Sequence, residues 1–490
     1  MRRMTEEPVA SQKAPSGFSA VRFATILGAA TGLGQASQLV WLTAGSRTMS
    51  ITDFGTVLAA QALYGILVFV VDGGSAFYGA RLEAQDQLNA ERLGSVVRVR
   101  LQAAALAAIV VLAVGLTAGR TFLLAAAPFA LALFLFALFA FWVPFGRGES
   151  GPWSAFSAGR GLAPASAALA CLALGASFPV WLAGVLESAV ILTVALAFGL
   201  RPFHHLRLGL LAHTAPWRDI LTVGLPTVVS QIGLASGTVL LAATGKAAAA
   251  AVLGVAVRLL TGVNQLSGLL ATALFPHLAQ NIASGDPDDA QEDASIGVGL
   301  ALTFAVAAAA TATFLFHPSF FVELLLDHSD PDAEATTILA LAAGGAVGYL
   351  LIWTIVLIAH RRESEILRAY LLGTGLIVAG SVAVVVASPG DPALAIAATF
   401  VAGQVASVLL VARRARRAVP AREALLRRGA VGAVAFAACV ATAALWADTR
   451  PLVLILVAIA AVALVAWVFR RRRAYALTAP MDAAPVPPPP

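Results

Sequence analysis

Two adjacent apolar runs near the middle of the chain place the strongest constraint on its fold. Residues 219–243 and 247–273 are each long enough to cross the ~30 Å hydrocarbon core of a bilayer as a helix. Arg258 interrupts the second run about 16 Å from its start, at ~1.5 Å per residue. A charge at that depth normally faces protein or water rather than lipid. Polar residues recur at helical spacing in both runs, namely Thr227, Gln231 and Thr238 in the first and Arg258, Thr261 and Gln265 in the second. Two polar stripes on neighbouring spanning helices predict a wet interior path.

The composition supports a membrane location for the whole chain. Of the 490 residues, 59% are hydrophobic and only 12% are charged, which is too little charged surface for a soluble protein of this length. Both cysteines lie inside apolar runs, so neither a disulfide framework nor a thiolate metal site is predicted. No Walker loop, nucleotide fingerprint or catalytic triad is present, and we expect a protein that is not an enzyme and needs no cofactor or metal.

The hydropathy pattern predicts an all-α polytopic membrane protein with fourteen transmembrane helices. Besides the two central runs, the predicted spans are residues 23–44, 55–76, 97–117, 121–143, 157–176, 178–199, 296–316, 335–358, 366–387, 392–411, 429–446 and 451–469. With this topology, nearly all of the 32 lysine and arginine residues lie on the side of the two termini. The positive-inside rule then predicts that both termini are cytoplasmic, and it explains the net charge of +6 without a nucleic-acid partner.

A shift of the sequence by 196 positions indicates an internal duplication. The shift aligns four pairs of polar or small residues, namely Arg22 with Arg218, Gly28 with Gly224, Thr31 with Thr227 and Gln35 with Gln231. Because each half has six helices, an even number, we expect two lobes that enter the membrane in the same orientation. The predicted division is a disordered N-terminus (residues 1–22), an N-terminal lobe (23–200), a linker (201–217), a C-terminal lobe (218–412), a basic linker (413–428), a helix pair (429–469) and a disordered proline-rich tail (470–490).

Four short passages carry a resemblance to a known family. They are Asp53–Phe54–Gly55, Asp72–Gly73–Gly74, Gly224–Leu225–Pro226 and Leu274–Phe275–Pro276. In their order and spacing, the chain resembles the lipid-linked oligosaccharide flippases, the polysaccharide branch of the multidrug/oligosaccharidyl-lipid/polysaccharide (MOP) exporter superfamily. The similarity covers roughly residues 23–411. One departure is that many members carry an acidic residue in the external half of helix 7, where this chain has Gly237–Thr238–Val239.

The resemblance implies a fold and a mode of action. We expect two pseudo-symmetric six-helix lobes around a central cavity, with the C-terminal helix pair outside the duplication. Alternating access of that cavity would carry the head group of an amphiphile across the bilayer, while its lipid tail stays among the lipids.

Arginine residues are the first candidates for substrate binding. The guanidinium of Arg258 offers a planar fork to the phosphate oxygens of a lipid-pyrophosphate-linked sugar. Its structural alternative is an ion pair with Asp72 or Glu187. We predict that Arg22, Arg160 and Arg218 lie near the cytoplasmic ends of helices 1, 5 and 7. There they either form a basic funnel for the head group or only orient the helices.

Amide and acidic residues complete the set of candidates. Gln35, Gln231 and Gln265 either bind sugar hydroxyls or join helices by hydrogen bonds. Asp72 and Glu187 are candidates for ion coupling, with solvated packing as the alternative for both.

The predicted function is transport of a lipid-linked saccharide across the cytoplasmic membrane, with membrane lipids and polysaccharide polymerases or glycosyltransferases as partners. One alternative is a drug or small-solute exporter of the same superfamily. Such exporters usually have twelve helices and often an acidic residue in helix 1, which residues 23–44 lack. The other alternative is a non-transporting scaffold for glycan assembly, which would have lost the interior polar residues that this chain keeps.

Overall fold

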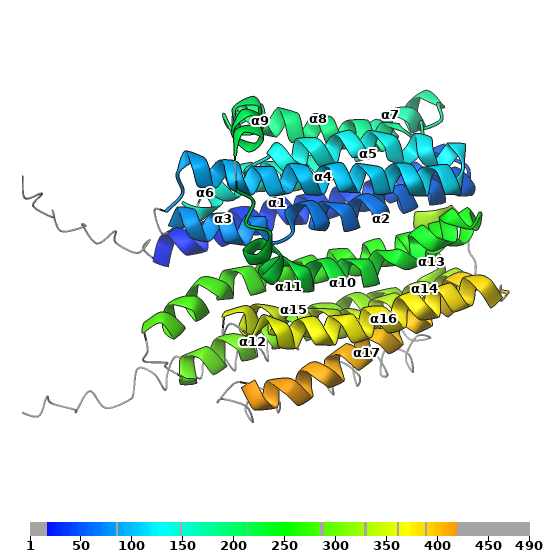
Figure 1. Cartoon of the computed structure of the whole chain (residues 1–490). Helices are drawn as coiled ribbons and strands as arrows, with labels where there is room; N and C mark the ends of the chain where they lie inside the picture. Colours follow the sequence, from blue (N-terminus) through cyan, green and yellow to red (C-terminus); the bar gives the residue numbers. More distant parts are fainter. Residues whose placement is uncertain are drawn as a thin grey trace, which may run out of the picture.

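The computed structural model describes residues 17–84, 87–147, 149–212, 214–284, 289–327, 331–359, 362–387 and 390–418. Within these ranges the chain forms seventeen helices and no strand. The predicted helix pair at 429–469 and the predicted terminal segments before residue 17 and after residue 469 lie outside the described residues. Figure 1 shows the helices in two groups, with α1–α9 in the upper half of the view and α10–α17 below them. We call these groups lobe 1 and lobe 2.

Most of the predicted spans correspond to long helices. Lobe 1 contains α1 (Gly17–Thr48), α2 (Ile51–Asp72), α3 (Ser75–Ala84), α4 (Ala90–Ala118), α5 (Arg120–Leu138), α6 (Trp142–Gly146), α7 (Gly151–Leu174), α8 (Leu182–Ala197) and α9 (Pro202–Leu211). Lobe 2 contains α10 (Trp217–Ala243), α11 (Ala247–Ser284), α12 (Asp289–Phe316), α13 (Pro318–Leu326), α14 (Pro331–Ala342), α15 (Gly344–Ala359), α16 (Glu363–Ala387) and α17 (Pro392–Ala418). The tenth predicted span is divided between α14 and α15.

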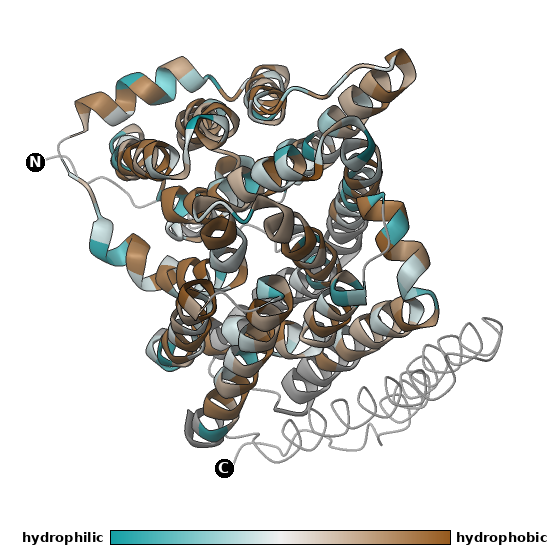
Figure 2. Cartoon of the chain, turned by 90° about the vertical axis from the view of Figure 1, so that its right-hand side faces the viewer, coloured by the Kyte–Doolittle hydropathy of each residue, from teal (hydrophilic) through white to brown (hydrophobic). Residues whose placement is uncertain are grey.

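In the described part of the chain, nine helices are long and apolar enough to cross a membrane, or eleven if two sharply bent helix pairs each count as one span. The bent pairs are α8 with α9, at 95°, and the end of α12 with α13, at 90°. Although α1 has 32 residues, it is not among the nine. Apolar residues predominate on the helices in the end-on view of Figure 2. The described residues therefore have the build of a multi-pass membrane protein.

The packing of the helices repeats from lobe 1 to lobe 2, as the duplication predicts. The contact of α1 with α7 has its counterpart in α10 with α16, and that of α2 with α5 in α11 with α15. The contact of α7 with α8 likewise corresponds to that of α16 with α17. Between the lobes, α2 packs on α10 and α1 on α11. The two-lobed architecture expected from the sequence is confirmed.

Four short helices do not follow from the hydropathy pattern. They are α3, α6, α9 and α13, each of ten residues or fewer. Left-handed backbone separates α2 from α3, with φ of 52° at Gly73 and 91° at Gly74, a conformation that glycine adopts without steric cost. Here the backbone of the Gly73–Gly74 pair meets Gly224 of α10, and no side chain fits between them. The two lobes therefore touch through backbone at the end of the bundle where α1 begins, which we call the Gly17 end.

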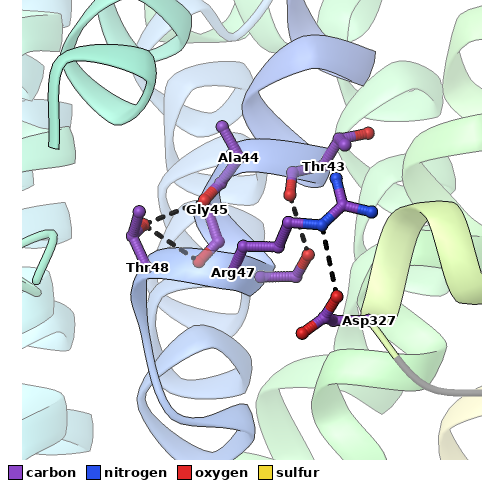
Figure 3. A network of polar contacts seen from close by, with 7 residues as sticks. Thr43, Ala44, Gly45, Arg47, Thr48 and Asp327 are labelled. Carbon is purple, nitrogen blue, oxygen red and sulfur yellow. Dashed lines mark hydrogen bonds and ion pairs between the residues drawn. The ribbon is translucent and has the colours of Figure 1, made fainter. Parts of the chain in front are cut away.

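At the opposite end, which we call the Thr48 end, side chains also join the lobes. Nε of Arg47, at the end of α1, lies 3.2 Å from Oδ1 of Asp327, which follows α13 (Figure 3). Gly55 of α2 packs directly on the backbone of Ala247 and Ala251 in α11. Contacts at both ends of the bundle therefore hold the lobes together in this structure.

A charged residue is completely buried inside lobe 1. Arg100 of α4 has no exposed surface, and its Nη2 donates to the Phe136 carbonyl oxygen over 2.7 Å. Nη1 of Arg100 donates to Oγ of Ser75 over 3.2 Å and lies 3.4 Å from Oδ1 of Asp72. The guanidinium also stacks over the Phe136 ring, 4.8 Å from its centroid. This network connects α2, α3, α4 and α5 near the Gly17 end.

The close crossing of α1 and α7 gives a first test of the packing. At Gly34 a Cβ atom would collide with the backbone of Ser157, whereas at Gly32, on the same helix, it would meet nothing within 4 Å. We expect Gly34→Ala to destabilise the protein by ~1–3 kcal/mol through overpacking. Gly32→Ala serves as the matched control and should leave the unfolding midpoint in detergent unchanged. Equal midpoints for both variants would contradict this helix crossing.

The Arg100 network gives a second test. Removing one partner of a buried ion pair typically costs ~3–5 kcal/mol, because the other charge stays buried without compensation. We therefore expect Asp72→Asn to lower the thermal unfolding midpoint, and Asp72→Asn combined with Arg100→Met to recover part of the loss. The measurement is the thermal unfolding midpoint of each purified variant in detergent. A double variant that is less stable than the single one would contradict the pairing.

Candidate functional site

A small polar cavity lies between the lobes. Its volume of about 20 Å³ leaves room for about one water molecule. Helices α1, α2, α5, α7 and α8 of lobe 1 and α11 of lobe 2 supply its walls. The lining residues are Gln38, Gln61, Tyr64, Phe129, Arg160, Pro164, Ala183, Leu186, Glu187, Val190 and Arg258.

Glu187 of α8 is the acidic residue of this cavity. Its Oε1 accepts a hydrogen bond from the Tyr64 hydroxyl over 2.9 Å and lies 2.7 Å from Nε of Arg160. The Arg160 guanidinium also lies over the rings of Tyr64 and Phe156, 5.7 and 5.2 Å from their centroids. One carboxylate oxygen thus holds two donors, which come from α2 and α7.

Arg258 enters the same cavity from lobe 2. Its Nη2 donates to Oε1 of Gln61 over 3.0 Å, and Gln61 lies one helical turn from Tyr64 on α2. Among the described residues Arg258 forms no ion pair, so the structural alternative of a pair with Asp72 or Glu187 is not formed here. The guanidinium is instead satisfied in part by a neutral amide of the other lobe.

Two further glutamines contribute to this region. Nε2 of Gln35 donates to Oε1 of Gln265 over 2.7 Å, which adds a second polar link between the lobes, here from α1 to α11. Nε2 of Gln38 donates to the backbone carbonyl of Arg160 over 3.2 Å. In this conformation Gln35 and Gln265 therefore join helices, which is the second of the two roles expected for them. Gln231 is half-buried on α10 and does not line the cavity.

The structure corrects the expected position of Arg160. The hydropathy pattern predicts that this span starts at residue 157, but α7 starts at Gly151 with Pro152 in its first turn, where proline is favoured. Arg160 is therefore about 14 Å into the helix at ~1.5 Å per residue, and it lines the cavity rather than the mouth of a funnel. Arg218 is exposed in the first turn of α10, as expected for the helix end. Arg22 lies on the helical backbone of α1, and its side chain is outside the described set.

The two acidic candidates occupy different environments. Glu187 lines the cavity, whereas Asp72 is paired with Arg100 and is not among the lining residues. Gln61 and Tyr64 also line the cavity, and neither is a site residue predicted from the sequence. Their spacing of three on a long apolar helix was the signal that could have identified them, because it places both on one helix face.

The cavity carries an excess of positive charge. Two guanidiniums, those of Arg160 and Arg258, face one carboxylate, that of Glu187. Arginine keeps its charge inside proteins and offers five N–H donors that suit phosphate and carboxylate oxygens. Among the described residues no group of three or more His, Cys, Asp or Glu side chains is placed to hold a metal ion. The chemistry of this site is suited to anion binding.

Comparison with known proteins identifies the fold. No family model and no curated protein matches the sequence. Among solved structures, the lipid II flippase MurJ in an inward closed conformation matches with a TM-score of 0.61 and 12% identity, over 92% of this chain and 99% of that one. The multidrug transporter DinF-BH of the MATE family matches with a TM-score of 0.57 and 14% identity, over 84% and 99% of the two chains.

An outward-facing multidrug resistance transporter of the MATE family, described as a member of the MOP superfamily, matches with a TM-score of 0.52 and 13% identity. It covers 87% of this chain and 99% of that one. The matches span both lobes and agree with the repeated helix packing described above. The chain therefore has the fold of the MOP transporter superfamily.

Proposed function

We propose that this protein is a flippase that carries a lipid-linked oligosaccharide, a polysaccharide precursor, across the cytoplasmic membrane by alternating access. The observation that supports this most directly is the guanidinium of Arg258, which lies between the lobes with a neutral amide as its partner. A half-buried arginine with no carboxylate partner among the described residues favours an anionic ligand, and the phosphate groups of a lipid-linked saccharide carry fixed negative charge.

The contacts between the lobes support a transport cycle in which the cavity opens at one end of the bundle and then at the other. The lobes touch through Gly74 and Gly224 at the Gly17 end and through Arg47 and Asp327 at the Thr48 end. With both ends in contact, the cavity has room for about one water and cannot hold a sugar head group. In the proposed cycle, parting of the lobes at one end admits the head group to Arg160 and Arg258, and parting at the other end releases it.

The remaining candidates have secondary roles in this proposal. Arg22 and Arg218 attract the anionic head group at the Gly17 end, and Gln231 contacts the sugar when the lobes have parted. Glu187 is the better candidate for ion coupling because it lines the cavity, while Asp72 serves the buried Arg100 network. Polysaccharide polymerases or glycosyltransferases act as partners that supply or consume the lipid-linked saccharide.

Multidrug export is the second candidate function, since transporters of that kind share the fold. The positive excess of the cavity favours an anionic ligand over a cationic one. A scaffold without transport activity would have no use for two arginines in a cavity between lobes, because such charges cost free energy to bury.

The proposed orientation places the Gly17 end in the cytoplasm. We expect a cysteine at Gly119, exposed between α4 and α5, to react with an impermeant thiol reagent added to intact cells. A cysteine at Arg207, exposed on α9, should react only after the cells are opened. Both variants are made with Cys171 and Cys439 replaced by alanine. The reverse labelling pattern would contradict the orientation.

The Arg258 hypothesis predicts a graded loss of transport. Arg258→Lys keeps the charge but loses the bidentate fork, so it should retain partial flipping of a lipid-pyrophosphate-linked saccharide in reconstituted vesicles. Arg258→Gln removes the charge and should lower the rate at least tenfold, with folded protein recovered at normal yield.

Arg120→Gln is the matched control, because Arg120 is exposed at the start of α5 and far from the cavity lining. It should flip the saccharide at the wild-type rate. Flipping by Arg258→Gln at the wild-type rate would contradict the proposed function, and so would equal losses in Arg258→Gln and Arg120→Gln.

A further inference from the structure

The ion pair between Arg160 and Glu187 has an unusual distribution of exposure. The Arg160 side chain keeps 33% of its surface exposed, whereas Glu187 keeps 9%. Glu187 contacts Nε, and neither terminal nitrogen of Arg160 is engaged by another described residue. The guanidinium is therefore open toward the cavity on the side that its carboxylate does not cover.

Glu187 has a second partner that does not depend on Arg160. The Tyr64 hydroxyl donates to Oε1 over 2.9 Å, and Tyr64 is only 2% exposed, so this donor is fixed in the wall of lobe 1. If Arg160 turned to another anion, Glu187 would keep this hydrogen bond. The carboxylate of Glu187 therefore keeps one hydrogen-bond donor when its ion pair with Arg160 is broken, whereas a carboxylate with a single partner would keep none.

Arg258 has the opposite arrangement. Its described partner is the neutral amide of Gln61, and no carboxylate competes for it among the described residues. The two arginines of one cavity thus differ, because one carries an internal anion and the other does not. Among the described residues an incoming anion has no ion pair of Arg258 to break, but it must displace Glu187 to engage Arg160 fully.

We propose that Glu187 is an internal counter-anion that occupies Arg160 in the empty transporter and is displaced by the anionic group of the ligand. This inference rests on the proposed function, in which Arg160 and Arg258 bind that group. When the ligand is present, Glu187 stays on Tyr64. Its return to Arg160 then drives the ligand off, so that Glu187 weakens binding and speeds release. No proton has to move for this exchange.

The proposal predicts opposite effects on binding and on turnover. Glu187→Gln removes the competing charge while keeping a side chain of the same shape, so purified protein should bind inorganic pyrophosphate about tenfold more tightly than wild type. A tenfold change corresponds to about 1.4 kcal/mol. In vesicles the same variant should flip a lipid-pyrophosphate-linked saccharide more slowly, because release is slowed. If Glu187 only positioned Arg160, its loss would weaken pyrophosphate binding instead.

Two further variants separate charge from packing. Tyr64→Phe keeps the Glu187 charge but removes the hydroxyl that holds the displaced carboxylate, so it should weaken pyrophosphate binding rather than tighten it. Glu91→Gln, which alters an exposed carboxylate at the start of α4, should have no effect. If Glu187→Gln fails to fold, as judged by its unfolding midpoint, Glu187→Asp draws the carboxylate back by one methylene and should tighten binding by a smaller factor.

If the Glu187 variants bind pyrophosphate no more tightly than wild type does, the proposed exchange of Glu187 for the ligand at Arg160 is overturned. If wild type still binds pyrophosphate through Arg258, so that Arg258→Gln weakens binding, that result leaves the proposed function intact. Tightening by Tyr64→Phe as large as by Glu187→Gln would also overturn the exchange, because charge would not be the cause. Absence of pyrophosphate binding in wild type and in every variant would overturn both proposals.

Discussion

The cost of removing a guanidinium from water shapes the interior of this protein. Arginine stays charged in proteins and carries five N–H donors, so a buried arginine needs partners in several directions. The chain meets this need in three ways. Arg100 has a hydroxyl, a carbonyl and a carboxylate around it, Arg160 has one carboxylate and two aromatic rings, and Arg258 has one amide. The number of partners falls from Arg100 to Arg160 to Arg258, although Nε of Arg100 is buried without a hydrogen-bond partner.

The number of partners that each arginine has depends on its position in the fold. Arg100 lies within lobe 1, in a network that includes Asp72 and Ser75 close to the break after α2. Arg160 of lobe 1 and Arg258 of lobe 2 line the same cavity, where lobe 1 meets α11. The partners of Arg100 join four helices of lobe 1, while Arg160 and Arg258 keep donors that a ligand could engage. The same residue type therefore serves packing in one place and binding in the other.

The sequence predicted the helical architecture well, because hydropathy and charge report directly on membrane spans. It also predicted that Arg258 and Gln265 face the interior, from their helical spacing. It failed for Arg160, because the predicted span begins at residue 157, six residues after the helix itself begins. The partners of Arg160 depend on how helices far apart in the sequence pack. Glu187 meets Arg160 and Tyr64 only after α2, α7 and α8 have come together.

Arg100 shows the same limit. On a helix that begins in a run of charged residues, the sequence gives no sign that this arginine turns inward while Arg98 binds the Ala212 carbonyl of the connection between the lobes. The hydropathy pattern describes one helix at a time, and it carries no information on which neighbour offers a carbonyl or a hydroxyl. Short helices such as α3 and α9 were missed for a related reason, since they depend on the turns before them.

The contact of Gly73 and Gly74 with Gly224 has a consequence for the speed of any lobe movement. Where side chains interlock, two surfaces can separate only after many rotamers have changed, which makes the separation slow and cooperative. At this crossing backbone meets backbone between Gly74 and Gly224, and the side chains of Ile220 and Leu221 lie beside Gly73. Few rotamers therefore have to change when this contact opens. The Gly17 end is a contact that can part with little rearrangement of side chains.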